Sequence, residues 1–143
     1  MYEKDYILRI IEQAGVMLRA MLTAIREQRP QDVDGPAREA LTLILGLPSG
    51  LTDSLTPAGL LTLLSTGGGL DATRARLAAE VYVRRVQADR AMGLTESTDQ
   101  DVAKALRLIG AVIESGEAGD VAEARALLAE LDDRSKPGGA EPS

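Results

Sequence analysis

The spacing of the apolar residues constrains this chain most, because it follows helical turns. From Asp5 to Gln28, apolar residues recur in steps of four and three. They are Ile7, Ile11, Ala14, Leu18, Met21 and Ile25. Such a series is the heptad seam of a packed helix. Asp5 is a suitable N-cap and Pro30 stops the pattern, so the spacing predicts a helix over this segment.

Further helical segments follow between breaks rich in glycine and proline. We expect helices over 37–45, 72–92 and about 98–115, a last one from Asp120 to Leu131, and a short helix after Thr56. Thr98 and Asp120 each begin a capping-box-like spacing. No segment alternates as a half-buried strand does. The fold expected is therefore an all-α compact bundle of about five main helices plus one short helix. We expect one domain over 1–132 and a disordered tail over 133–143.

Two strings carry resemblances. Gly119 to Ala124, followed by apolar positions up to Leu131, resembles the turn and second helix of a tetratricopeptide repeat. The opening, Asp5 to Gln13, resembles that of an uncharacterised bacterial family of small, all-helical proteins with similar repeats. The resemblance implies a bundle of tetratricopeptide-like antiparallel helix hairpins. It implies no activity, cofactor or site residue.

Missing residue types narrow the possible functions. The chain has no Cys and no His, which removes thiolate and imidazole chemistry from catalysis and metal binding. Its net charge of −6 disfavours nucleic acid and anionic membranes as partners. It shows no apolar stretch long enough to span a bilayer and no basic N-terminal signal. We therefore expect a cytoplasmic protein that is not an enzyme and has no metal, no cofactor and no catalytic residues.

Several local motifs have ordinary structural interpretations. We expect the glycine-rich stretch 65–69 to be a linker and residues 32–35 to be a turn. The carboxylate pairs Asp99/Asp101 and Asp132/Asp133 lie where helices are expected to end, so helix capping is the favoured role. Five arginines fall in the helix over 72–92, at positions 74, 76, 84, 85 and 90. They scatter around the helix axis, which favours solvated, intramolecularly paired side chains over a nucleic-acid surface. The leucines of 60–64 are expected in the core.

The first helix is apolar over more of its circumference than a surface helix needs. Leu8, Gly15 and Leu22 lie beside the predicted seam. Either the helix is central to the bundle, or it also meets a second chain. The candidate self-association face comprises Tyr6, Ile7, Ile10, Ile11, Met17 and Met21. We expect a protein–protein interaction module with an unidentified protein partner, self-associating as a homodimer. The alternative is a small-molecule or metal-binding protein, possibly enzymatic, that uses carboxylates and arginines in an interhelical pocket.

Overall fold

The computed structural model describes residues 2–65 and 67–132. Over these residues the regular structure is all helical, which confirms the all-α bundle. The elements are α1 (Tyr2–Arg26), the 3-10 turn η1 (Pro30–Asp32), α2 (Asp34–Leu45), α3 (Ser49–Asp53), α4 (Pro57–Leu64), α5 (Ala72–Met92), α6 (Thr95–Ser115) and α7 (Ala118–Asp132). The predicted tail, 133–143, lies outside the described residues.

Several helix ends are fixed by the signals present in the sequence. Thr56 Oγ1 accepts a 2.9 Å hydrogen bond from the Gly59 backbone N–H at the start of α4. Asp71 does the same for the Arg74 N–H, at 3.2 Å, at the start of α5. That helix ends at Gly93, whose φ of 73° lies in the left-handed region that favours glycine. These residues confirm the predicted starts of α4 and α5 and the predicted end of α5.

Other boundaries differ from the predictions because backbone and tertiary contacts replace the expected caps. The Thr98 N–H donates to Leu94 O at 3.0 Å, so α6 begins one turn before the predicted Thr98 cap. Asp120 lies inside α7, where its carboxylate accepts from Arg76 Nε of α5 at 3.1 Å. The short α3 and η1 were not predicted. Each is one turn or little more, too short for an apolar period to appear.

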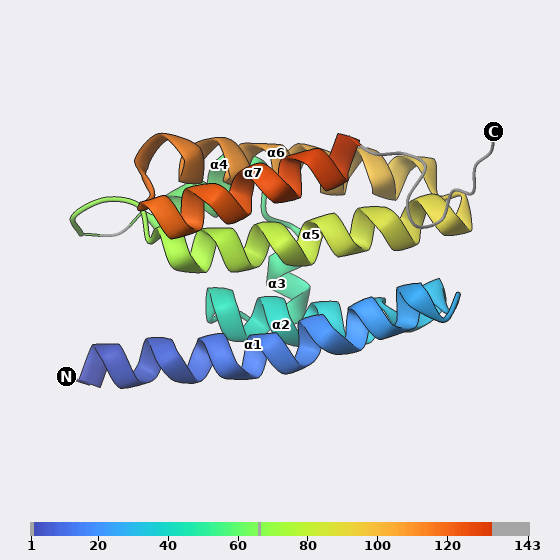
Figure 1. The fold of residues 1–143 in the computed structure, drawn as a ribbon, viewed down its shortest axis with the longest axis horizontal. Coiled ribbons are helices and arrows are strands. Elements are labelled where there is room, and N and C mark those ends of the chain that lie inside the picture. Colours follow the sequence, from blue (N-terminus) through green and yellow to red (C-terminus); the bar gives the residue numbers. More distant parts are fainter. Residues whose placement is uncertain (1, 66, 133–143) are drawn as a thin grey trace.

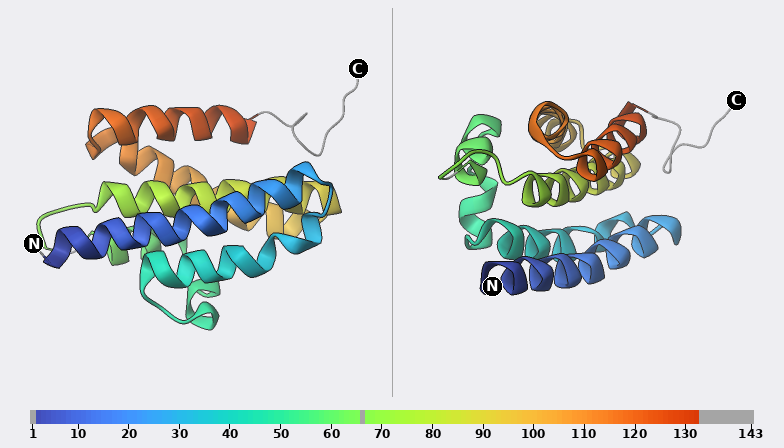
Figure 2. Two further views of the ribbon diagram at one scale, coloured as in Figure 1. Left: turned by 60° about the horizontal axis from the view of Figure 1, so that its bottom comes forward. Right: turned by 60° about the vertical axis from the view of Figure 1, so that its left-hand side comes forward.

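The helices form two layers that meet on α5 (Figure 1). α1 and α2 pack against each other in one layer, and α6 and α7 pack on the opposite side of α5. α3 crosses between the layers, as the right-hand view in Figure 2 shows. α4 packs against α5 and α6. Because α5 contacts both layers, it is the central helix of the bundle.

The core is built mainly from aliphatic side chains, with Tyr82 of α5 as its one fully buried aromatic residue among those described. Leu60 and Leu64 of α4 are 0% and 1% exposed, which confirms that the leucine-rich string serves the protein's own core. On α1 the innermost positions are Ile10, Ala14, Leu18, Met21 and Ala24. Both layers are thus held to α5 by apolar burial.

Candidate functional site

The residues of the predicted self-association face occupy different environments. Ile10 and Met21 are 1% and 0% exposed and belong to the core. Ile11 and Met17 are half-buried and pack against that core, and Ile7 is half-buried. Tyr6 is 56% exposed. Ile10 and Met21 are therefore not accessible to another chain. Tyr6 is accessible, and Ile7, Ile11 and Met17 are partly accessible.

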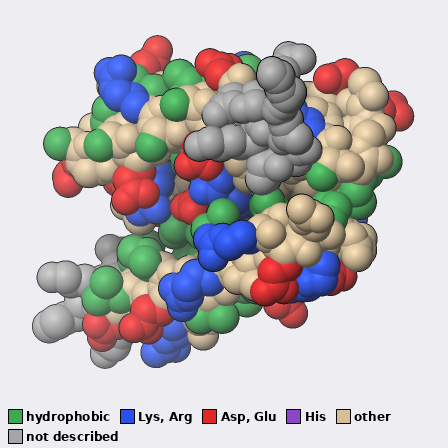
Figure 3. All heavy atoms as spheres, turned by 45° about the vertical axis from the view of Figure 1, so that its right-hand side comes forward, with side chains coloured by type: hydrophobic (Ala, Val, Ile, Leu, Met, Phe, Trp, Pro, Cys, Tyr) green, Lys and Arg blue, Asp and Glu red, His purple; other side chains and the backbone are tan. Residues whose placement is uncertain are grey.

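A second apolar surface follows the flank of α1 and includes residues outside that predicted set. We call it the α1 flank and define it as Leu8, Ile11, Gly15, Leu18, Leu22 and Ile25. Leu8 is 52% exposed, Leu18 is buried and the others are half-buried. Figure 3 shows apolar side chains along the lower layer, beside a hollow between the layers. The sequence signal for this surface is a second series of three- and four-residue steps, beginning at Leu8.

The α5 arginines are paired within the protein, as predicted, but they are not solvated. Arg74 Nε donates to the Ile44 carbonyl of α2 at 2.7 Å, and Arg90 Nη1 donates to the Leu131 carbonyl of α7 at 3.0 Å. Arg76 is paired with Asp120 of α7. These side chains are half-buried. The arginines therefore tie the central helix to its neighbours.

Arg84 lies at the centre of a largely buried ion network between α5 and α7. Its side chain is 7% exposed and forms ion pairs with Glu80, at 3.6 Å, and with Glu130 of α7. Arg84 Nη1 also donates to Gln87 Oε1 at 3.1 Å. Burial raises the pKa of Glu80, and the neighbouring Arg84 partly offsets that rise. The network fixes the position of α7 on α5.

A pair of buried acids lies between α5 and α6. Asp89 and Asp101 are 7% and 3% exposed, and Ser97 Oγ donates to Asp89 Oδ2 at 2.9 Å. Arg85 Nε lies 3.5 Å from Asp101 Oδ2, an oxygen without a hydrogen-bond partner among the described residues. Burial, reinforced by the Asp89 side chain and opposed by Arg85, raises the pKa of Asp101 to about 7. The predicted capping role for Asp101 is wrong, because α6 starts earlier and turns this side chain inward.

Lys104 extends the same cluster toward the surface. Its Nζ lies 5.5 Å from the centre of the Tyr82 ring, a cation–π contact. Burial lowers the pKa of Lys104, and burial raises the pKa of Tyr82. Lys104 also lines a hollow of about 300 Å³ with Asp53 and Gln100. Asp101 is more deeply buried than this lysine, so protonation of Asp101 acts on the packing of α5 and α6.

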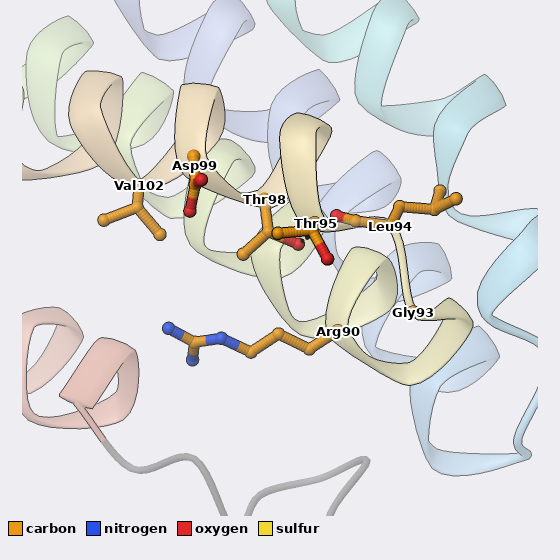
Figure 4. Close-up of a pocket in the computed structure, with 7 residues that line it drawn as sticks. All are labelled: Arg90, Gly93, Leu94, Thr95, Thr98, Asp99 and Val102. Carbon is orange, nitrogen blue, oxygen red and sulfur yellow. Dashed lines mark hydrogen bonds between the residues drawn. The ribbon is translucent and has the colours of Figure 1, made fainter.

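A larger cleft of about 460 Å³ opens where α5 ends and α6 begins (Figure 4). Its lining includes Arg90, Thr95, Thr98, Asp99 and Val102. The Arg90 side chain extends from α5 along the side of the cleft opposite Asp99. Since Arg90 also donates to the Leu131 carbonyl, its guanidinium has a structural role at the end of α7. The cleft is thus lined by one cation that also bonds α7, one anion and two hydroxyl groups, of which that of Thr98 donates to the Leu94 carbonyl.

Among the residues that the structure describes, no three or more acidic side chains gather in a way that could hold a metal ion. Within the same residues, no helix is both long enough and apolar enough to cross a membrane.

Comparison of the chain with family models, with curated proteins and with solved structures returned no match.

Proposed function

We propose that this protein is a non-catalytic interaction module that associates with itself through α1. The observation that carries the proposal is the α1 flank, where apolar side chains continue from the core to the outer surface. An apolar strip left on a helix surface is stabilised when a partner covers it. Exposed apolar residues elsewhere, such as Leu51 of α3 and Leu106 of α6, lie on separate helices. The α1 flank instead runs along several turns of one helix.

The rest of the molecule supports a scaffold. Its chemically versatile groups, Arg84, Arg85, Asp89 and Asp101, are committed to internal contacts between helices. The α6–α7 hairpin, with Ala124 of α7 fully buried, supports the tetratricopeptide-like arrangement that we also propose. An acidic chain without cysteine is in keeping with a cytoplasmic location.

Sedimentation equilibrium over a range of concentrations tests the proposal. The wild-type chain should show a concentration-dependent dimer, and Leu8→Asp should shift it to monomer. Leu106→Asp is the matched control, because Leu106 is 44% exposed on α6 and Leu8 is 52% exposed on α1. A wild-type chain that stays monomeric, or a loss of association in the Leu106 variant alone, would contradict self-association through α1.

The cleft in Figure 4 favours a second candidate, a binding site for a small zwitterionic or polyhydroxylated molecule. Its charged groups, Arg90 and Asp99, lie on opposite sides of the opening. Thermal unfolding with glycine betaine, amino acids, sugars and Mg²⁺ tests this candidate, because a ligand bound only by the folded state raises the midpoint. A rise that Asp99→Asn abolishes would support it, and unchanged midpoints throughout the panel would exclude these ligands.

A further inference from the structure

The charges beside the α1 flank repeat with the same period as the flank itself. Asp5, Glu12, Arg19 and Arg26 follow one another at intervals of seven residues. Glu12, Arg19 and Arg26 each come directly after an apolar flank residue, Ile11, Leu18 or Ile25. All four side chains are exposed, and none forms an ion pair with another described residue. Acids occupy the first half of the series and arginines the second half.

The helix dipole accounts for only part of this order. It favours acids in the first turn and bases in the last turn, so it explains the ends of the series, and its effect fades within one turn. Glu12 and Arg19 lie in the middle of α1, beyond the first and last turns. The signs and spacing of these two charges therefore need another explanation. Pairing of two α1 helices supplies one.

In an antiparallel pair of α1 helices, the charge order becomes complementary. Layers form when Leu8 packs against Ile25 of a second copy, Ile11 against Leu22, and Gly15 against Leu18. Glu12 then lies beside Arg19 of the second copy, and Asp5 lies beside its Arg26. A two-fold axis repeats each pair, so all four charges find an opposite charge. In a parallel pair, these charges would instead lie beside Ile7, Ala14 and Met21 of the second copy, so no opposite charges would meet.

The space around Gly15 suits this crossing. A Cβ added to Gly15 would meet only the Arg19 guanidinium, with Nη1 at 3.5 Å. No other described helix of this chain therefore covers the middle of the flank, and a second helix can approach closely there. Leu18, the layer partner of Gly15, is the most buried residue of the flank. Because only 5% of Leu18 is exposed, this layer contributes mainly by letting the two helix backbones come close at Gly15.

We propose that two copies of this chain pair their α1 helices antiparallel along the α1 flank, with Glu12 of each copy beside Arg19 of the other. This inference rests on the proposed self-association and adds its partner, direction and register. The apolar layers supply the attraction, and the charge pairs select antiparallel over parallel pairing.

Charge reversal tests the register. Glu12→Arg and Arg19→Glu each turn two attractive pairs into repulsive ones, so each variant alone should raise the dimer dissociation constant about tenfold. In an equimolar mixture of the two variants, one copy carries arginine at both positions and the other carries glutamate at both. Because opposite charges then meet again at each pair, the mixture should recover the wild-type dissociation constant as a heterodimer.

Arg9→Glu is the matched control, since it makes the same charge change as Arg19→Glu at an exposed position outside the flank. It should leave association unchanged. Circular dichroism and thermal unfolding confirm that each variant is folded. A dimer that neither reversal weakens overturns the pairing and leaves self-association standing. Two weakened variants that do not recover on mixing overturn the antiparallel register, and a monomeric wild-type chain overturns both proposals.

Discussion

α1 and α5 distribute their side chains in opposite ways. α1 lies on the outside of the bundle, yet it leaves apolar side chains such as Leu8 exposed. α5 lies at the centre, yet it carries Arg84 and Asp89, which are 6% and 7% exposed. The depth of a helix in this bundle is therefore not set by its apolar content alone. It also depends on whether the neighbouring helices supply opposite charges to its buried charged side chains.

The two helices also differ in what their unusual residues require. Buried charges on α5 are stable only while partners on α6 and α7 compensate them. Exposed apolar residues on α1 gain stability only when another surface covers them. The first requirement is met in large part within the chain, and the second calls for a second chain. Four predictions test this contrast, from the largest expected effect to the smallest.

The largest effect is expected from Arg84→Ala, which leaves Glu80 and Glu130 without their shared cation. Because Glu80 is largely buried and Glu130 is half-exposed, we expect a loss of about 2–3 kcal/mol in the free energy of unfolding. Urea denaturation followed by circular dichroism measures it. Arg125→Ala, at an exposed position on α7, should leave the unfolding midpoint nearly unchanged. Equal effects of the two substitutions would show that the network adds no stability.

The second effect concerns the pH dependence of stability at Asp101. Its pKa in the folded protein is about 7, above the ordinary value of 3.8, so the folded state holds a proton that the unfolded state releases. This contribution to stability is complete below about pH 4 and is lost as the pH rises through 7. Between about pH 5.5 and about pH 8 the wild-type chain should lose roughly 2 kcal/mol.

Asp101→Asn is neutral at every pH and removes this titration. Urea denaturation at the same two pH values should therefore show a much smaller loss in the variant. A residual decline is expected from Glu80, whose pKa burial also raises. If the variant and the wild-type chain lose the same free energy, Asp101 is not the titrating group.

These two regions also show which features of the structure can be predicted from the sequence and which cannot. The apolar period predicted the helices, and Thr56, Asp71 and Gly93 predicted several of their ends, because periods and caps are local properties. Burial of the arginines and the inward position of Asp101 depend on charges distant in the sequence. Asp120, for example, pairs with Arg76, which lies far from it in the sequence, and no local pattern predicts this contact. On α1, the heptad predicted that its apolar residues make contacts, without specifying which chain they meet.

A third effect is expected at Tyr82, whose buried hydroxyl has no hydrogen-bond partner among the described residues. Tyr82→Phe removes this uncompensated polar group and keeps the ring beneath Lys104. We expect the free energy of unfolding to rise by about 1 kcal/mol. Tyr82→Leu, which also removes the ring, is the comparison and should be destabilising. A Phe variant less stable than the wild-type chain would show that the hydroxyl is satisfied in solution.

The smallest effect is expected from two glycines inside helices, Gly15 of α1 and Gly110 of α6. A Cβ at Gly110 would meet no atom within 4 Å, and at Gly15 only the Arg19 guanidinium. Replacing either glycine by alanine should raise the free energy of unfolding by about 0.5–1 kcal/mol. Thermal unfolding at low protein concentration measures the monomer. A strong loss at Gly15 alone would mean that another part of this chain occupies that side of α1.

The most direct test of the antiparallel α1 pair is a distance between two identical spin labels. The chain has no cysteine, so Glu27→Cys, just after α1 and outside the flank, introduces one attachment site per copy. With a rise of about 1.5 Å per residue, antiparallel pairing separates the two labels by about 30 Å. Electron–electron double resonance on the spin-labelled dimer should measure that distance. A much shorter separation, set by the roughly 10 Å between helix axes plus the reach of the two labels, would indicate parallel helices, and the absence of any defined distance would contradict pairing through α1.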